Sequence, residues 1–394
     1  MSTKDRWLLP EGVEELLPAE ARRVEALRRS LLDLFEGWGY EFVMPPLIEY
    51  LEALLTGAGQ DLDIQTFKLT DHLTGRLMGV RPDMTPQAAR IDAHYLKRIG
   101  PVRLCYAGSV LRTRPDEFGG SREPLQVGAE LFGHAGPEAD AEILSLMIEA
   151  LRLADIREAH IELGHVGVFR GLAAKANLGA EQEKELFEAL QRKARNEVDA
   201  LLAAGDAPVA SKRMLAGLLD LCGEQEVLSR AREQLRGAPE TVIRALDELQ
   251  SVARQVARRP RAPVLYFDLA ELSGYHYYTG AVFSAFVPGC GRAVARGGRY
   301  DGIGRSFGRD RAATGFGADL RQWLQLSAVA APALAGILAP DDADTTLQVE
   351  VARLRAAGER VVMRLTGDQS AASEFGCDRE LVQHAGRWKV AVVK

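Results

Sequence analysis

The chain has 394 residues, 26% of them charged and 47% hydrophobic, which suffices for two or three domains and is typical of a soluble globular protein. Its formal net charge of −6 provides no global basic field for nucleic acid, although an acidic protein can carry a local basic groove. No stretch approaches about 18 uncharged apolar residues and the N-terminus lacks an apolar signal core, so we expect a cytoplasmic protein without membrane insertion.

Cysteine and histidine spacing gives no sign of a metal site. The four cysteines lie far apart without a C-x-x-C pair, so we expect reduced thiols. The histidines show no ligand spacing either, and His160 and His165 on a predicted strand are interpreted as structural. There is no Walker-type phosphate loop. We therefore predict no bound metal and no cofactor.

The N-terminal part predicts a helix followed by β-rich segments. After Pro18, apolar residues recur at three- and four-residue intervals, which predicts an amphipathic helix that Gly37 ends. Residues 40–50 predict a strand that runs into a proline-bounded turn. Residues 102–113 and 125–134 flank a polar segment, which predicts an antiparallel hairpin with a long tip.

The residue composition and the predicted elements then change at about residue 170 and again at about residue 330. Residues 139–154 predict a helix and residues 160–169 a strand, but composition shifts toward Ala, Leu, Glu and Arg at about residue 170. Two further strands, at 264–269 and 281–287, precede a predicted helix at 313–326. From about residue 330, strand and helix patterns alternate, which indicates a small α/β domain.

Several separated segments resemble, in order, the motifs of histidyl-tRNA synthetases. These segments are GYEFVMPPLIE (39–49, class II motif 1), VRPDMTPQAAR (80–90), GSVLRTRP with LQVGAELFG (108–115 and 125–133, motif 2), SGYHYYTG (273–280) and ARGGRYDGIGRSFG (295–308). The resemblance covers roughly residues 5–325. It implies an α+β protein with a class II synthetase-like core, in which helices flank an antiparallel sheet.

The domain boundaries follow from combining this resemblance with the changes in composition. We expect the core to comprise residues 1–169 and 259–327, interrupted by a helical insertion at 170–258. Residues 328–394 form a small, reduced α/β C-terminal domain.

The resemblance implies an amino-acid pocket for histidine. Its expected residues are Asp83, Thr85, Arg112, Gln126, Glu130, Tyr277, Tyr278 and Tyr300. Their chemistry suits this ligand, because carboxylates and amide oxygens accept from an ammonium, and tyrosine hydroxyls with a carboxylate satisfy an imidazole. Each residue also has a plainer interpretation. The tyrosines could be packing elements, Asp83 could cap a helix, and Glu130 could lie on a solvated strand face.

Three elements that handle ATP in the resembled family are altered. Ser273 stands where the family has a catalytic Arg, and His276 where it has an Asp. Gln322 stands at the position of the Arg that clamps ATP in motif 3, with Arg321 one residue earlier, turned by about 100° on a helix. The motif 2 segment LRTRP is one residue short and lacks its acidic residue. We therefore predict that aminoacylation is lost.

A kept amino-acid pocket beside a lost ATP clamp resembles the regulatory subunits of ATP phosphoribosyltransferase. That resemblance implies a non-catalytic subunit in the first step of histidine biosynthesis, partnered with a short-form catalytic subunit and responding to histidine. It also implies a homodimer within a hetero-oligomer, with Pro46 at the dimer interface, and no tRNA.

Two alternatives stay open. A divergent histidyl-tRNA synthetase would need an arginine elsewhere in space to replace Ser273, and an amino-acid sensor could act on a different partner.

Overall fold

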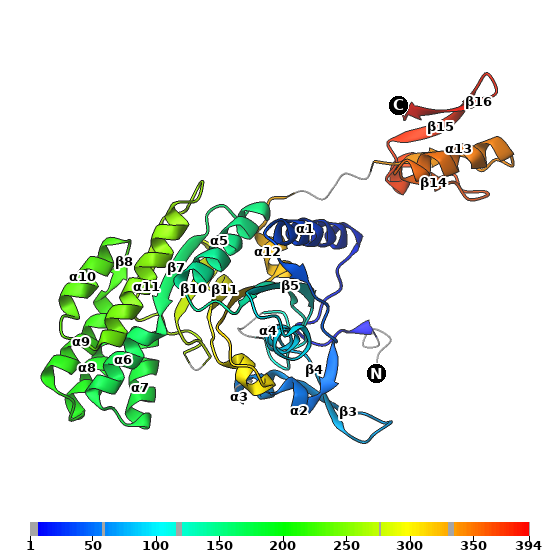
Figure 1. The fold of residues 1–394 in the computed structure, drawn as a ribbon. Coiled ribbons are helices and arrows are strands. Elements are labelled where there is room, and N and C mark those ends of the chain that lie inside the picture. Colours follow the sequence, from blue (N-terminus) through cyan, green and yellow to red (C-terminus); the bar gives the residue numbers. More distant parts are fainter. Residues whose placement is uncertain (1–6, 57–59, 116–119, 276, 330–334, 394) are drawn as a thin grey trace. The chain divides into compact units, whose positions relative to one another are not determined.

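The computed structural model describes residues 7–56, 60–115, 120–275, 277–329 and 335–393. The chain divides into two compact units, Met1–Val329 and Ala330–Lys394 (Figure 1). The helical segment predicted at 170–258 lies within the first unit. In the described part of the chain, no helix is both long and apolar enough to cross a membrane.

Among the described residues of the first unit, nine strands form one mixed sheet in the order β1-β5-β6-β12-β11-β10-β7-β9-β8. The strands are β1 (Glu41–Phe42), β5 (Val102–Ser109), β6 (Leu125–Phe132), β7 (His160–His165), β8 (Cys222–Gly223), β9 (Leu265–Asp268), β10 (Ala281–Phe286), β11 (Ala293–Arg299) and β12 (Ala313–Asp319). All pairs are antiparallel except β1 with β5 and β7 with β9. The predicted hairpin of β5 and β6 is confirmed.

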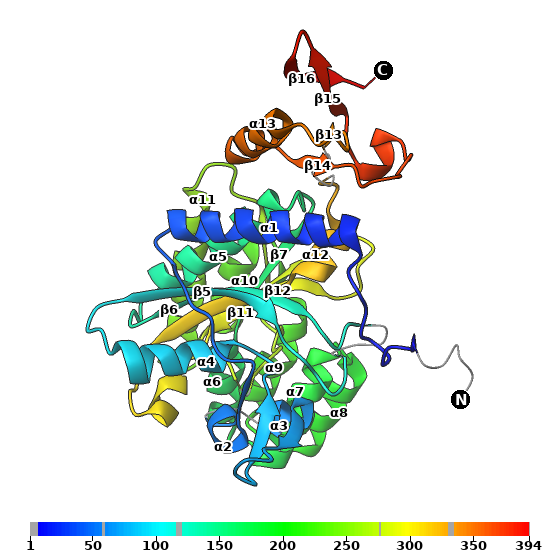
Figure 2. The same cartoon turned by 90° about the vertical axis from the view of Figure 1, so that its right-hand side faces the viewer.

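Long helices cover one face of this sheet, and a smaller layer covers the other (Figure 2). The first face carries α1 (Pro18–Gly37), α5 (Pro137–Leu153), α11 (Glu240–Ala257) and the short α12 (Leu320–Leu326). The second carries α4 (Thr85–Arg90), which contacts β6 and continues into a π-helix at Ile91–Leu96. Next to α4 lie α2 (Leu51–Leu54), α3 (Gln60–Gln65) and a sheet of β2 (Ile48–Tyr50), β4 (Leu77–Val80) and β3 (Phe67–Thr70).

Between residues 166 and 257 the structure describes six α-helices. They are α6 (Val166–Ala176), α7 (Ala180–Gln191), α8 (Arg195–Ala204), α9 (Val209–Gly217), α10 (Glu226–Gln234) and α11. Strand β8 lies inside this segment and pairs with β9, which ties the helices to the edge of the main sheet.

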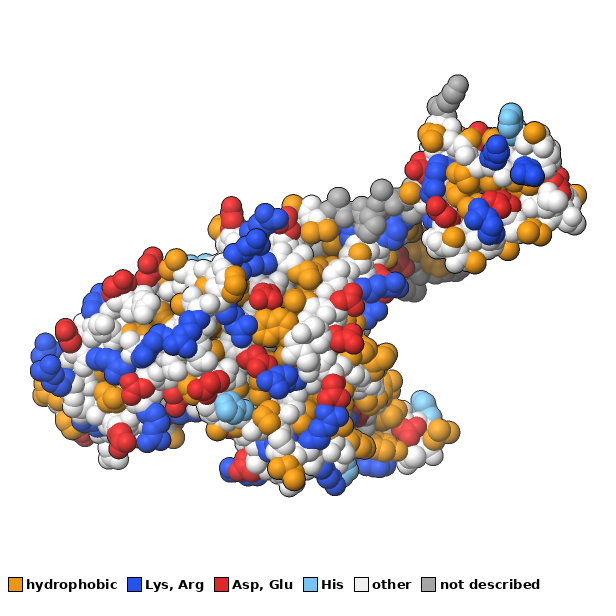
Figure 3. Space-filling model, turned by 45° about the horizontal axis from the view of Figure 1, so that its top comes forward, with side chains coloured by type: hydrophobic (Ala, Val, Ile, Leu, Met, Phe, Trp, Pro, Cys, Tyr) orange, Lys and Arg blue, Asp and Glu red, His pale blue; other side chains and the backbone are white. Residues whose placement is uncertain are grey.

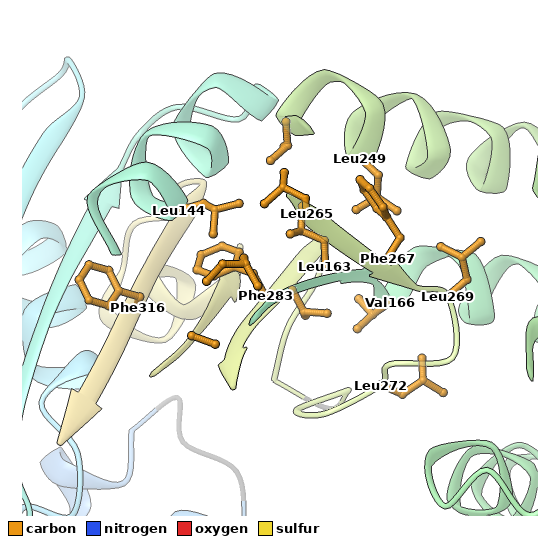
Figure 4. Packing of buried hydrophobic residues seen from close by; sticks show 14 of the residues in the cluster. Leu144, Leu163, Val166, Leu249, Leu265, Phe267, Leu269, Leu272, Phe283 and Phe316 are labelled. Atoms are coloured by element: carbon orange, nitrogen blue, oxygen red, sulfur yellow. The ribbon is translucent and has the colours of Figure 1, made fainter. Parts of the chain in front are cut away.

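The largest hydrophobic core lies between the main sheet and its helices. Figure 4 shows Leu144 of α5 and Leu249 of α11 close to Leu163, Phe267 and Phe283 of β7, β9 and β10. Each such fully buried side chain contributes about 1.5–3 kcal/mol relative to an exposed one. This core therefore holds the central strands of the sheet rigidly from one side.

Two expected elements are wrong. Residues 160–169 are not one strand, because β7 ends at His165 and α6 begins at Val166; the Nδ1 atom of His165 accepts from the Gly167 N–H at 3.0 Å and caps the helix. Residues 313–326 are not one helix, because β12 occupies 313–319. Alternating glycines disfavour a helix there, and the Asp319 carboxylate starts α12 by accepting from the Arg321 N–H at 3.0 Å.

The second unit is a small α/β unit in its described residues. A sheet in the order β14-β13-β15-β16 packs against α13 (Thr345–Ala356). Its strands are β13 (Ile337–Ala339), β14 (Val361–Met363), β15 (Arg379–His384) and β16 (Arg387–Val392). On the face shown in Figure 3, basic and acidic side chains lie interspersed over both units. This distribution agrees with the small net charge.

Candidate functional site

The candidate site is a cavity of about 250 Å³ on the face of the main sheet opposite α5. Strand alternation explains its polarity, because successive side chains point to opposite faces. In β6, Val127, Ala129 and Leu131 join the core with α5, so Gln126 and Glu130 point the other way.

All eight residues expected in the amino-acid pocket line this one cavity. They come from the start of α4, the segment that follows β5, β6, the loop before β10, and the residue after β11. The cavity is also lined by residues that the sequence did not single out, among them Arg292, Arg296 and Asp319.

Glu130 is the centre of the buried polar network. Its side chain is only 1% exposed, which excludes the interpretation of a solvated strand residue. One carboxylate oxygen accepts from the Tyr106 hydroxyl at 2.8 Å and the other from the Tyr300 hydroxyl. Burial raises the pKa of Glu130 to about 8, while the two tyrosine hydroxyls act against this rise. At neutral pH this carboxyl group is therefore mostly the neutral acid.

Asp83 and Gln126 form a second polar centre. The Gln126 Nε2 donates to Asp83 Oδ1 at 2.7 Å, and its Oε1 accepts from the Met84 N–H at 2.9 Å. The same Asp83 oxygen accepts from the Thr85 N–H at 2.9 Å, beside the start of α4. Asp83 thus supports the helix start, as the plainer interpretation expected, and also lines the cavity.

The tyrosines form an aromatic wall. The rings of Tyr277 and Tyr300 stack with centroids 5.2 Å apart and an interplanar angle of 19°, and Tyr278 meets Tyr277 edge-on at 5.2 Å. Tyr300 is 2% exposed, whereas Tyr277 is 38% exposed. The wall therefore runs from the buried Glu130 end to the mouth of the cavity.

Tyr106 completes the Glu130 network, although no motif pointed to it. It lies on β5 opposite Gly128 of β6, and its hydroxyl lies 3.0 Å from the Thr85 hydroxyl. The two-residue period of side-chain direction along β5 could have placed it on the Glu130 face once the hairpin register was known.

Glycines make room for this network. Gly315 of β12 lies opposite Glu130, and a Cβ atom there would lie 1.5 Å from a Glu130 oxygen. A Cβ at Gly128 would lie 2.5 Å from the Tyr106 hydroxyl. The G-x-G alternation in residues 315–317, which misled the helix prediction, therefore serves the cavity.

Of the positions that differ from the synthetase motifs, some line the cavity and others lie outside it. Gln322 lines the cavity and its Nε2 lies 3.5 Å from the Cys290 sulfur. Arg321 does not line it, because its guanidinium donates to the Glu14 carbonyl at 2.9 Å and pairs with Glu123. Ser273 is also not among the described lining residues, and its N–H donates to Glu271. His276 lies outside the described residues.

The cavity thus offers buried acceptors, hydroxyls and an aromatic wall to a small polar ligand. Arg112 lines it while donating from Nε to the Pro82 carbonyl at 3.2 Å. In the described part of the chain, no group of three His, Cys, Asp or Glu side chains could hold a metal ion. The arrangement is suited to binding an ammonium and a ring with a donor and an acceptor.

Comparisons with known proteins identify the families that this chain resembles. Residues 12–323 match the family model of histidyl-tRNA synthetase, and residues 334–391 match that of the ATP phosphoribosyltransferase subunit HisZ C-terminal domain. The chain is 56% identical over 394 residues to an ATP phosphoribosyltransferase regulatory subunit of Pseudomonas syringae pv. syringae, covering 99% of each protein. A regulatory subunit of Ectopseudomonas mendocina is also 56% identical over 99% of both.

Solved structures show the same fold. An ATP phosphoribosyltransferase regulatory subunit/histidyl-tRNA synthetase from Bacillus halodurans has a TM-score of 0.84 at 29% identity and covers 95% of this chain and 97% of its own. A histidyl-tRNA synthetase from Nostoc sp. PCC 7120 has a TM-score of 0.80 at 20% identity, with 98% and 97% covered. The expected α+β fold with a class II synthetase-like core is confirmed.

Proposed function

The chain belongs to the family of ATP phosphoribosyltransferase regulatory subunits, and we propose that it is the non-catalytic subunit through which histidine regulates that enzyme. The partner in this proposal is a short-form catalytic subunit. The observation that carries the role of histidine is the cavity, which gathers eight dispersed residues of suitable chemistry around a buried carboxyl group.

Histidine fits the cavity by its two ends. The ligand ammonium is held near Asp83 and Gln126, whose oxygen atoms can accept from it. The imidazole is held between Glu130 and Tyr300, where one ring nitrogen shares a proton with the Glu130 carboxyl group and the other donates to a tyrosine hydroxyl. A ligand without this ring would leave buried partners unpaired, which is the source of sharp selectivity in such sites.

Aminoacylation is absent in this proposal because two positions that carry cations in the synthetase motifs no longer place a cation in the cavity to meet the charge that builds up during ATP-dependent activation. Ser273 carries no charge, Gln322 is neutral, and Arg321 is engaged by Glu14 and Glu123 outside the cavity. The loss of one preorganised donor costs about 2.7–4 kcal/mol, or roughly 10²–10³ in rate.

We also propose that the subunit forms a homodimer through the surface around Pro46. An open pocket there is lined by Pro46, Ile48, Tyr50, Met78 and Tyr95, and neighbouring apolar side chains are exposed. Contiguous exposed apolar surface of this kind marks an interaction site.

Regulation requires that histidine favour one state of the complex over another, since a ligand shifts an equilibrium only by its differential affinity. The segments that line the cavity join the start of α4 to the central strands, so ligand binding links two layers of the first unit. We propose that this linkage is what the catalytic subunit senses.

Two measurements test the function. Calorimetry on the purified chain should show saturable binding of L-histidine, and an exchange assay with ATP and pyrophosphate should show no histidine-dependent exchange. A divergent synthetase is the second candidate, because Arg296 lines the cavity and could replace the missing cation at Ser273. Measurable exchange would establish that candidate and contradict the non-catalytic role.

A further inference from the structure

We propose that Arg296 binds the carboxylate of the amino-acid ligand and thereby sets the preference of the cavity for histidine over analogues that lack this charge. The inference rests on the proposed function, since it takes the ammonium and imidazole contacts as given. Two observations support it: the register of β6, β12 and β11, and the hydrogen-bond and ion-pair partners of the arginines near the cavity.

Strand register places Arg296 beside the open floor of the cavity. Arg296 of β11 lies directly opposite Gly317 of β12, and Gly317 lies opposite Gly128 of β6. Directly opposed residues of antiparallel strands point to the same face of a sheet. Arg296 therefore shares the face of Glu130 and lines the cavity, next to two residues that have no side chain.

This glycine row lies between the two polar centres. In β6, Gln126 lies two residues before Gly128, and Glu130 lies two residues after it. A histidine whose ammonium is near Gln126 and whose ring is near Glu130 must pass over Gly128 and Gly317. The α-carboxylate branches from the Cα atom, between the ammonium and the ring. Arg296 of β11 approaches this atom across the glycines of β12 and β6.

Among the described residues, none forms a hydrogen bond or ion pair with the Arg296 guanidinium, and Arg296 is exposed and lines the cavity. It lies near Tyr278: burial and the Glu130 and Asp83 carboxylates raise the pKa of this tyrosine, whereas the Arg296 charge lowers it. An arginine presents a planar fork of donors that matches a carboxylate in two parallel hydrogen bonds.

The other arginines near the site are engaged or more distant. Arg112 donates to the Pro82 carbonyl, and Arg299 pairs with the buried Asp140 at 2.9 Å on the other face. Arg292 also lines the cavity but lies four residues before Arg296, roughly 13 Å farther from Tyr300 along an extended chain. Arg296 is therefore the cation placed to reach the ligand's carboxylate.

The experiment is calorimetry on the full chain with two probes, L-histidine and L-histidinol, which keeps the ammonium and imidazole but has a hydroxymethyl group in place of the carboxylate. The proteins are the unaltered chain, Arg296→Met, Arg296→Lys and the matched control Arg292→Met. We expect the unaltered chain to bind histidine about 10- to 100-fold more tightly than histidinol. Arg296→Met should bind both probes with the histidinol affinity of the unaltered chain, and Arg296→Lys should retain part of the preference.

Unchanged histidinol affinity also shows that Arg296→Met is folded. A wild-type preference for histidine in Arg296→Met, or loss of that preference in Arg292→Met alone, would overturn the assignment while the proposed function stands. If the unaltered chain bound neither probe, both proposals would be wrong.

Discussion

Replacing Glu130 with glutamine changes one acceptor atom at the buried end of the cavity. The carboxylate of Glu130 accepts from the Tyr106 hydroxyl at 2.8 Å and from the Tyr300 hydroxyl, and it faces the proposed imidazole. A glutamine amide keeps the shape, but its nitrogen can only donate. One tyrosine hydroxyl then loses its acceptor, and the ligand ring loses the carboxyl group with which it shares a proton.

The magnitude follows from this exchange. A hydrogen bond to a charged group contributes about 1.5–3 kcal/mol, which corresponds to roughly 10- to 150-fold in the dissociation constant for histidine. Calorimetry of both proteins at pH 7.5 measures this ratio. The control is Val209→Ala, on the exposed surface of α9. Gln126→Glu is unsuitable as a control because it adds charge beside Asp83.

The pH dependence provides a sharper test. Without ligand, Glu130 has a pKa of about 8. Above this pH its carboxylate must take up a proton when histidine binds, because the carboxyl group and the ligand ring share one proton in the complex. Between pH 7.5 and 9 the unaltered chain should lose about tenfold more affinity than Glu130→Gln. Equal loss in both proteins would refute the assignment of this proton to Glu130.

The same group makes stability depend on pH with a defined sign. Its pKa rises from 4.5 in the unfolded chain to about 8 in the folded one, so its contribution is fully present below pH 4.5 and declines as pH rises through 8. Thermal unfolding at pH 6 and pH 9 should therefore show a smaller decrease in midpoint for Glu130→Gln than for the unaltered chain. A larger decrease would contradict burial as the cause of the shift.

Three further changes have defined outcomes. Gly315→Ala should abolish histidine binding in a folded protein, because its Cβ would lie 1.5 Å from a Glu130 oxygen, whereas Gly37→Ala, at the end of α1 with no atom within 4 Å of the new Cβ, should bind, as calorimetry would show. Asp140→Ala should lower the free energy of unfolding by about 3 kcal/mol in denaturant titration, because it removes the buried partner of Arg299 and leaves that guanidinium only the more exposed Asp301, at 3.3 Å, as an ion-pair partner. Met44→Asp should convert the proposed dimer to a monomer in sedimentation, because Met44 is 82% exposed beside Pro46.

Each of these outcomes has a contradicting result. Equal binding by the Gly315 and Gly37 variants would show that displacing Glu130 does not affect the ligand. A loss under about 1 kcal/mol in the Asp140 variant would show that its pair with Arg299 behaves like an exposed one. A dimer that survives Met44→Asp would place the subunit interface elsewhere.

Local pattern was sufficient for elements whose periodicity matches their burial. The spacing of Val24, Leu27, Leu31 and Phe35 predicted α1, and all four are buried. The strand β12 was missed because Gly315 and Gly317 carry no side chain to show a two-residue period. Their role becomes visible only when the neighbouring strand brings Glu130 and Tyr106 against them.

The sequence motifs predicted those lining residues of the candidate site that belong to the motifs. They did not predict the residues that only strand pairing brings to the cavity. Residues such as Asp83 and Tyr300 belong to recognisable segments and line the cavity. Arg296 lies within such a segment but is not one of the residues that define the motif. Only the register of β11 with β12 places it on the cavity face, and such a long-range pairing is not encoded in local sequence.

The most direct test of the central claim is the rate at which the short-form catalytic subunit transfers the phosphoribosyl group to ATP, measured against histidine concentration. We predict that histidine lowers this rate when the chain is present, and that Glu130→Gln moves the response to roughly 10- to 150-fold higher histidine concentration. An identical histidine response with the unaltered chain, with Glu130→Gln and with the catalytic subunit alone would contradict the account.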